Sequence, residues 1–248
     1  MKLDSASVCK TETGAASAAN GCKTETRGEQ KTAASLRGGR ALRDALRLYA
    51  VTDRHWLNGR TLAECVEQAI DGGATFVQLR EKNLDEQDFL REAEELKKLC
   101  AERGVPFVVN DNVMIAKEAH ADGVHVGQSD MACLEARRLL GPDSIIGVRA
   151  QTVEQAVLAE KQGADYLGVG AVFATGSKAD AESVPIETLK EICQTVKIPV
   201  VAIGGINAGN VHQLKGSGIA GVSVISAIFA NDDIHAATKV LAEKAEDL

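Results

Sequence analysis

Eight short apolar runs, rich in β-branched residues, alternate with segments of helical periodicity from residue 48 to the end of the chain. The runs are LYAVTD, TFVQLR, PFVVND, GVHVG, SIIGVRA, DYLGVGAVF, IPVVAIGG and GVSVISAIF. Strands that are apolar almost throughout, and not only at every second position, are covered on both faces, as in parallel sheets. Eight such strand–helix units predict an α/β protein, a closed (β/α)8 TIM barrel.

The competing architecture is an open, doubly wound sheet with helices on both faces. Such a sheet normally uses about five or six strands and carries a glycine-rich fingerprint directly after the first strand. Here the first run is followed by TDRHWLNGR, which contains no such fingerprint. The pattern therefore favours the barrel.

Two of the predicted helices begin with recognisable start signals. Thr61 precedes Glu64, and Thr152 precedes Gln155, directly before an apolar helical pattern. This spacing predicts two capping boxes, in which each side chain of the pair accepts a hydrogen bond from the backbone N–H of the other residue. We expect the apolar faces of these helices to pack against the sheet.

Residues 1–40 differ in composition from the rest of the chain. They are rich in Ala, Thr, Ser and Gly, have almost no large apolar residue, and contain CKTET twice. Such a segment cannot bury enough apolar surface to offset the entropy of ordering it. We expect a disordered low-complexity tail over residues 1–40 and a single TIM-barrel domain over residues 41–248. Acidic residues such as Asp4 and Glu12 argue against an organellar transit peptide.

The charge distribution excludes several classes of partner. The net charge is −7, and the Lys and Arg residues are scattered between acidic ones, so no basic stripe is available for nucleic acid. No apolar run approaches the roughly 20 residues of a membrane helix, and the first 40 residues lack the apolar region of a secretory signal. We expect a cytoplasmic protein that binds small molecules. A homo-oligomer is compatible with the sequence, which leaves the oligomeric state open.

The six cysteines are far apart, with no CxxC pair and no matching histidine spacing, so zinc is not indicated. Four of them fall at apolar positions of predicted helices, where a reduced, buried thiol acts as a small hydrophobic group. These are Cys65, Cys100, Cys133 and Cys193.

Two acidic residues follow consecutive predicted strands, Asp111 after PFVVN and Asp130 after GVHVGQS. The carboxyl ends of barrel strands converge on one mouth, where function is concentrated. Two carboxylates there repel one another unless a cation lies between them. Oxygen ligands suit Mg²⁺, which usually also binds substrate phosphates. Asp111 and Asp130 are therefore the predicted metal ligands.

Cations and glycines at other strand ends point to a phosphorylated substrate. Arg80, Lys82 and Lys178 offer charge-assisted donors for phosphate oxygens. Gly204 and Gly205 allow close approach of a ligand to the backbone after the seventh strand, where barrels often hold phosphate.

Each of these residues also has an ordinary structural interpretation. An Asp after a strand is often a turn former or a helix cap, a loop Lys is often only solvated, and two glycines can form a simple turn. None of the five histidines is paired at a catalytic spacing, and His125 is interpreted as a packing residue or a support for the site. Polar residues lie at six of the eight strand ends, and this coincidence favours a functional site over separate structural roles.

The runs YAVTD, QLREK, VVNDNVMIA, GVHVGQSD, GADYLGVGAVFATGSK and PVVAIGGIN, in this order, resemble the thiamine-phosphate synthase family. The resemblance covers residues 48–245. It implies a Mg²⁺-dependent transferase that joins 4-amino-2-methyl-5-(diphosphooxymethyl)pyrimidine to 4-methyl-5-(2-phosphoethyl)thiazole. The products are thiamine phosphate and diphosphate, and in this family the diphosphate leaves first to give a carbocation.

The resemblance also implies roles for individual residues. Arg80, Lys82 and Lys178 would act on the diphosphate as catalytic residues, and Asp111 and Asp130 would bind Mg²⁺. The substrate-binding set would be Gln78, Leu79, Arg80, Glu81, Lys82, Asn110, Arg149, Thr175, Gly176, Ser177, Lys178, Gly205, Ile225 and Ser226. Within it, Thr175, Gly176, Ser177, Gly205, Ile225 and Ser226 would hold the thiazole phosphate.

Three residues depart from the family's pattern. Arg149 stands where a Ser is expected, Gln151 where a His is expected, and Ala174 where a Pro is expected. Arg149 adds a cation for the diphosphate, but its large side chain could also occupy part of the pyrimidine pocket. Two alternatives follow: a thiazole tautomerase-like enzyme of the same fold, and a non-catalytic binding protein for phosphorylated thiamine precursors. The full set of acidic and basic residues argues against the first.

Overall fold

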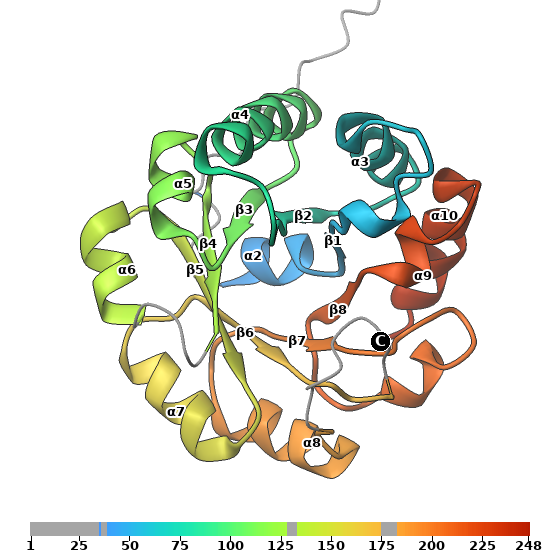
Figure 1. Cartoon of the computed structure of the whole chain (residues 1–248). Helices are drawn as coiled ribbons and strands as arrows, with labels where there is room; N and C mark the ends of the chain where they lie inside the picture. The colour runs from blue at the N-terminus through green and yellow to red at the C-terminus, as the bar shows by residue number, and fades with distance from the viewer. Residues whose placement is uncertain (1–34, 36–38, 128–132, 175–182) are drawn as a thin grey trace, which may run out of the picture.

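The computed structural model describes residues 35, 39–127, 133–174 and 183–248. Its eight strands form a closed parallel barrel, in which each strand pairs with the next along the chain and β8 pairs with β1. The predicted (β/α)8 fold is therefore confirmed (Figure 1). The strands are β1 (Leu48–Val51), β2 (Phe76–Leu79), β3 (Phe107–Asn110), β4 (Gly123–Val126), β5 (Ile145–Ala150), β6 (Tyr166–Val169), β7 (Val200–Ile203) and β8 (Gly221–Val224).

Helices surround the barrel, most of them between successive strands and the last two after β8. They are α3 (Leu62–Asp71), α4 (Glu86–Arg103), α5 (Val113–Glu118), α6 (Cys133–Leu140), α7 (Val153–Lys161), α8 (Ile186–Thr195), α9 (Ser226–Phe229) and α10 (Ile234–Ala245). Short 3₁₀ turns, η1 (Arg54–Trp56) and η2 (Val211–Leu214), follow β1 and β7. None of the helices in the described ranges is both long enough and apolar enough to span a membrane.

The strands are apolar on both faces because the barrel separates two cores. In β1, Leu48 and Ala50 belong to the core between barrel and helices, whereas Tyr49 and Val51 belong to a second cluster inside the barrel. Successive strand residues point to opposite faces, so one short strand supplies both cores.

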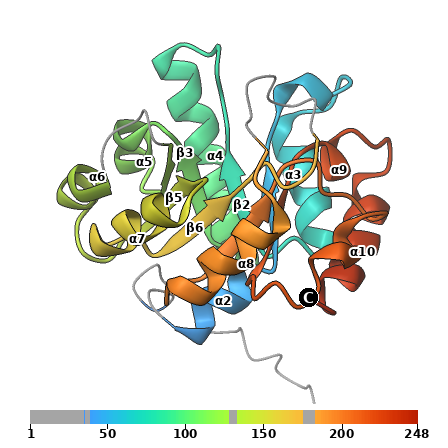
Figure 2. The ribbon, with the colours of Figure 1, turned by 90° about the horizontal axis from the view of Figure 1, so that it is seen from below.

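A helix that precedes the first strand closes one end of the barrel. Helix α2 (Arg40–Ala45) lies across the ring of strands in Figure 1 and at one end of the barrel in Figure 2. Leu42 of α2, and Leu46 just after it, are fully buried in the inner cluster. The predicted tail, residues 1–40, lies almost entirely outside the described residues.

The helix start signals are largely confirmed. Thr61 and Glu64 form both halves of a capping box at α3, with N···O distances of 3.2 and 2.7 Å. At α7 the Thr152 hydroxyl accepts from the backbone N–H of Gln155, but the Gln155 side chain accepts from Gln151 N–H and not from Thr152. The second predicted box is therefore wrong in one half, because the Gln155 side chain reaches one residue further back.

The cysteine prediction is confirmed for three of the four thiols. Cys65, Cys100 and Cys133 are buried and reduced, and Cys193 is partly buried. Burial raises the pKa of the Cys100 thiol to about 12, so this group stays protonated.

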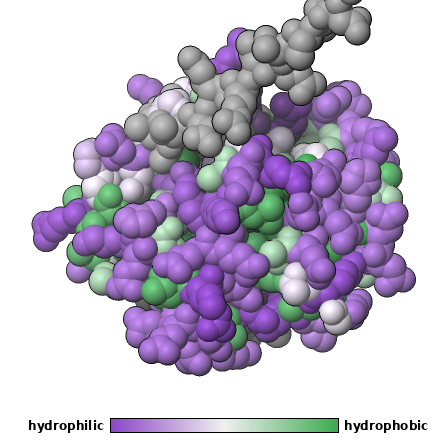
Figure 3. Space-filling model, turned by 90° about the horizontal axis from the view of Figure 1, so that it is seen from above, coloured by the Kyte–Doolittle hydropathy of each residue, from purple (hydrophilic) through white to green (hydrophobic). Residues whose placement is uncertain are grey.

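On one side of the molecule, polar side chains predominate and apolar patches are small (Figure 3).

Truncation of a buried side chain of α2 should destabilise the barrel. Leu42→Ala leaves a cavity inside the inner cluster, and we expect the free energy of unfolding to fall by about 2–5 kcal/mol. The matched control is Leu158→Ala, because Leu158 of α7 is 54% exposed and its truncation should cost less than about 0.5 kcal/mol. Chemical denaturation measures both values. Equal losses would mean that α2 does not support the barrel.

Candidate active site

Polar side chains line the inside of the barrel near the carboxyl ends of the strands. Val77 and Leu79 lie in the outer core, so Gln78 and Arg80 point inward from β2 and from the residue after it. By the same alternation Arg149 of β5 points inward, because Val148 and Ala150 lie in the outer core. The inner face at this end thus collects charge and hydrogen-bonding groups.

One terminal nitrogen of the Arg80 guanidinium has a hydrogen-bond partner, and the other has none. Its side chain is only 6% exposed, and its Nη1 donates to Asp53 Oδ2 at 3.2 Å. The backbone N–H of Arg80 donates to Thr52 Oγ1 at 3.0 Å. Its Nη2 is buried without a hydrogen-bond partner. A buried charged donor without a partner is costly, so this geometry favours an anionic ligand beside Nη2.

The carboxylate of Asp53 connects Arg80 to the first loop. While Oδ2 accepts from Arg80, Oδ1 accepts from the backbone N–H of His55 at 3.0 Å and caps the η1 turn. Asp53 is not among the site residues predicted from the sequence. Its position was nevertheless informative, since Asp53 follows the first strand closely, as Asp111 follows the third.

The other residues of the QLREK run have different environments. Glu81 is an almost buried ion-pair partner of Arg54, whose guanidinium also contacts Glu92 of α4. Burial raises the pKa of Glu81, and Arg54 opposes this shift. Lys82 is exposed, whereas Leu79 is fully buried in the outer core, so only the backbone of Leu79 can meet a ligand. Glu81 thus holds the first loop against β2 and α4.

The end of β3 carries the first predicted metal ligand. Asp111 has a left-handed backbone with φ 61°, and its N–H donates to the carbonyl of His125 at 2.9 Å. Asn110 Nδ2 donates to Asp111 Oδ2 at 2.6 Å. Within the described ranges, no three His, Cys, Asp or Glu side chains gather as a metal site. Asp130, the second predicted ligand, lies outside the described residues. The carboxylate and amide oxygens at the end of β3 fit a hard cation such as Mg²⁺.

Loops after β7 and β8 form a small pocket of about 30 Å³. Gly205, Ile225 and Ser226, three of the predicted binding residues, all line it. Gly205 has φ 65°, and a Cβ there would overlap the carbonyl oxygen of Ala174. The other predicted residues of this phosphate site, Thr175, Gly176 and Ser177, lie outside the described residues, as does Lys178.

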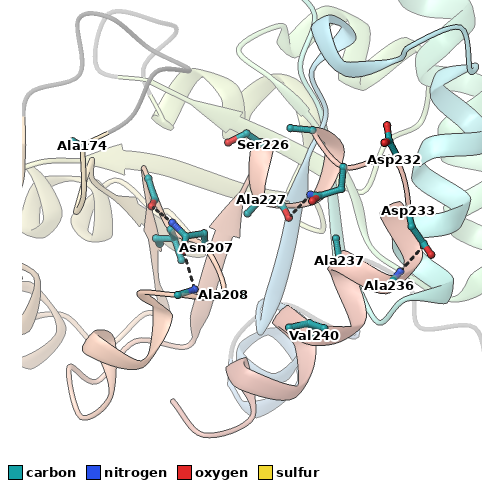
Figure 4. A pocket seen from close by; sticks show the side chains of 15 residues that line it. Ala174, Asn207, Ala208, Ser226, Ala227, Asp232, Asp233, Ala236, Ala237 and Val240 are labelled. Atoms are coloured by element: carbon teal, nitrogen blue, oxygen red, sulfur yellow. Dashed lines mark hydrogen bonds between the residues drawn. The ribbon is translucent and has the colours of Figure 1, made fainter.

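A larger cleft of about 870 Å³ adjoins this pocket on the outer side of the barrel (Figure 4). Ala227 of α9 and Ala236, Ala237 and Val240 of α10 give it a wall of small apolar side chains. Asp232 and Asp233, between these helices, also line the cleft. Two carboxylates repel phosphate, so the small pocket is the better candidate for an anion than the larger cleft.

The residues that depart from the family's pattern have distinct positions. Arg149 reaches the interior of the barrel, where a cation can meet a bound anion. Gln151 follows β5, and its backbone N–H is bound by the Gln155 side chain. Ala174 meets the Gly204–Gly205 turn, where its carbonyl packs against Gly205.

A closed (β/α)8 barrel with inward cations and a glycine-lined pocket after β7 has the architecture in which TIM-barrel enzymes often hold a phosphate group. The family model for thiamine monophosphate synthase matches residues 48–228. The chain belongs to this family, which confirms the resemblance found in the sequence.

Individual relatives match over nearly their full length. Thiamine-phosphate synthase of Clostridium novyi (strain NT) is 52% identical over 197 residues, which cover 79% of this chain and 97% of that protein. The Clostridium tetani (strain Massachusetts / E88) protein of the same name is 50% identical over 194 residues, covering 78% and 93%. The solved thiamine phosphate pyrophosphorylase from Pyrococcus furiosus is 40% identical, with a TM-score of 0.77, and covers 83% of this chain and 98% of its own.

Two glycine-to-alanine substitutions can separate the effect of close packing at Gly205 from the effect of its left-handed backbone. Gly205→Ala introduces both a left-handed alanine and an overlap with Ala174, so we expect the free energy of unfolding to fall by about 3 kcal/mol. The control is Gly216→Ala, because Gly216 has φ 74° but no atom within 4 Å of the added Cβ. This control should cost only about 1 kcal/mol. Similar losses in chemical denaturation would show that the close approach does not matter.

Proposed function

We propose that the chain is a thiamine-phosphate synthase, which joins the pyrimidine diphosphate to the thiazole phosphate and releases diphosphate. The observation that carries this proposal is the 52% identity to the Clostridium novyi enzyme over 97% of its length. The site supports it independently, because the buried Nη2 of Arg80 favours an anionic ligand.

The reaction needs stabilisation of a leaving group more than it needs a base. As the carbon–oxygen bond to the diphosphate breaks, negative charge grows on the departing oxygens, and cations already in place stabilise that change. Arg80 is such a cation, since Asp53 holds its guanidinium before any ligand arrives. We assign Lys82, Lys178 and Arg149 to the same diphosphate. The thiazole nitrogen then captures the pyrimidine-stabilised carbocation.

Asp111 and Asp130 would hold Mg²⁺ beside the diphosphate. The ion would supply concentrated positive charge for the departing oxygens. Asn110 supports this assignment, because its amide orients the Asp111 carboxylate. Asn110 and Gln78 are assigned to the pyrimidine diphosphate, together with the backbone of Leu79 and Glu81.

The small pocket after β7 and β8 is assigned to the thiazole phosphate. Gly205, Ile225 and Ser226 line it, and Thr175, Gly176 and Ser177 are assigned to the same group. A phosphate is larger than the present pocket of about 30 Å³, so it would lie at the opening and contact the backbone there. This arrangement would direct the ring of the thiazole toward the barrel axis.

A direct assay tests the proposal. The purified chain is incubated with both phosphorylated heterocycles and Mg²⁺, and thiamine phosphate and diphosphate are measured. We expect both products in equal amounts. Tautomerisation of a thiazole without diphosphate release would favour the tautomerase, and calorimetric binding without turnover would favour the binding protein.

The metal assignment predicts a specific loss. Asp111→Ala and Asp130→Ala should each abolish the Mg²⁺ dependence of diphosphate release and lower turnover by about a hundred-fold or more. Asp143→Asn is the control, since Asp143 is an exposed residue outside the mouth. Turnover and Mg²⁺ titration of the three variants give the answer. Wild-type Mg²⁺ dependence in both alanine variants would refute the assignment.

Asp53 should act as a positioning residue for Arg80. Asp53→Asn keeps a side-chain oxygen that can cap η1 but loses the charged pair with Arg80. We expect the KM for the pyrimidine diphosphate to rise about ten-fold, while the KM for the thiazole phosphate and the melting temperature stay close to those of the wild type. Asp53→Ala, which also removes the cap, should lower both affinity and stability. An equal change in both KM values in Asp53→Asn would contradict the positioning role.

A further inference from the structure

Five charged side chains form one cluster where the loops after β1 and β2 meet α4, and we call it the loop cluster. Asp53 pairs with Arg80, and Arg54 pairs with Glu81, so neighbouring residues of the two loops pair crosswise. Glu92 of α4 is the fifth member, and it contacts Arg54 as well. The loop cluster therefore contains one more acid than bases.

Glu81 and Glu92 contact the same nitrogen of Arg54. Glu81 Oε1 lies 3.2 Å from Nη2 of Arg54, and Glu92 Oε1 accepts a hydrogen bond from that nitrogen. The two carboxyl groups also interact directly with each other. Two carboxylates this close repel each other when both are ionised, and one guanidinium cannot neutralise both.

Both carboxyl groups are largely removed from water. The side chain of Glu81 is 4% exposed, and that of Glu92 is 18% exposed. One oxygen of each group, Oε1 of Glu81 and Oε2 of Glu92, is buried without a hydrogen-bond partner. Ionised carboxylates only accept hydrogen bonds, so two of them cannot satisfy each other. A proton on one of the two groups supplies the missing donor.

We propose that Glu81 and Glu92 share one proton, and that Glu92 thereby acts as a positioning residue for Arg80. The proton makes the loop cluster neutral, and it lets Arg54 bind both carboxyl groups without repulsion between them. Arg54 directly follows Asp53, whose carboxylate pairs with the Arg80 guanidinium. The shared proton thus joins α4 to the loop that orients Arg80.

The electrostatic surroundings of the pair support a retained proton. Burial is the largest cause of the raised pKa of Glu81, Glu92 raises this pKa further, and Arg54 opposes the shift. Within the described ranges, the charged groups that act on Glu81 are Arg54 of η1 and Glu92 of α4. On its own segment, Arg80 is paired with another acid and Lys82 is exposed. The two carboxyl groups should therefore titrate as a pair, in two separate steps.

The shared proton can be measured on the full chain without any ligand. ¹³C NMR of the glutamate carboxyl groups is followed against pH, and the two signals are assigned by their loss in Glu81→Gln and Glu92→Gln. We expect two separate steps for the pair, with the upper step above the ordinary pKa of glutamate. Two independent titrations near the ordinary value would overturn the proposal, as would ionisation of both groups below it.

Glu92→Gln tests whether the second carboxyl group is the cause. The amide can donate to Glu81 and carries no charge, so the pKa of Glu81 should fall and one step should remain. Glu94→Gln is the matched control, because Glu94 lies on the same helix and is exposed. An unchanged Glu81 titration in Glu92→Gln would refute the shared proton. If this variant does not fold, Arg54→Gln serves instead, since loss of the cation should raise the upper step further.

Stability provides a second measurement of the same pair. Because folding raises the pKa of Glu81, the stabilisation is present below the ordinary pKa of glutamate and is lost as the pH rises through the upper step. Over this range, the free energy of unfolding of the wild type should fall relative to that of Glu92→Gln. Chemical denaturation at several pH values measures the difference. A difference that does not change with pH would contradict the proposal.

The consequence for catalysis rests on the proposed function. Loss of the proton leaves an extra negative charge in the loop cluster, which weakens the attraction of Arg80 for an anionic substrate. As the pH passes the upper step, we expect the KM for the pyrimidine diphosphate to rise about five-fold in the wild type and in Glu94→Gln, relative to Glu92→Gln. The KM for the thiazole phosphate should follow the same pH profile in all three proteins.

Two results would separate the proposals. The same pH profile for the pyrimidine diphosphate in the wild type and in Glu92→Gln would refute the positioning role of Glu92. An inactive wild-type chain that still shows the two titration steps would refute only the proposed function.

Discussion

Closure of the parallel sheet is the constraint on which the rest of the structure depends. Because every strand is covered outside by helices and filled inside, a four-residue strand such as β1 must supply two cores. Polar groups are therefore confined to the strand ends or to a fully bonded network within. The helix α2 completes the inner core at the amino end, which leaves the carboxyl end as the open mouth.

The mouth is organised by ion pairs between neighbouring loops. Asp53 pairs with Arg80, and Glu81 pairs with Arg54. The loop after β1 and the loop after β2 therefore each supply one acidic and one basic residue to these two ion pairs. This arrangement orients Arg80 before a ligand binds, which is how enzymes reduce the cost of reorganisation during the reaction. Below the mouth, hydrogen bonds join Gln78, Tyr49, Tyr166 and His125 across the interior of the barrel.

Much of this molecule could be predicted from the sequence, and the failures have physical causes. The eight apolar runs predicted the strands because covered strands need apolar residues on both faces, and the family resemblance was confirmed by the match over residues 48–228. Asp53 was missed because an acid after a strand is common and its partner Arg80 lies on another strand. The half-formed capping box at Thr152 was missed because Gln155 could reach either of two backbone N–H groups. The roles assigned to the site residues remain predictions, for Asp111 and Arg80 as much as for Asp130 and Lys178.

The sequence by itself determined the barrel, the positions of its helices and the set of charged residues at the strand ends, because periodicity and local capping act over a few neighbouring residues. Only the tertiary structure decided which of these groups meet. Tyr49, Gln78, His125 and Tyr166 look like isolated polar residues in apolar runs, and Gly147 looks like an ordinary strand glycine. They become one hydrogen-bonded chain only when the sheet closes, since each of the four polar residues belongs to a different strand.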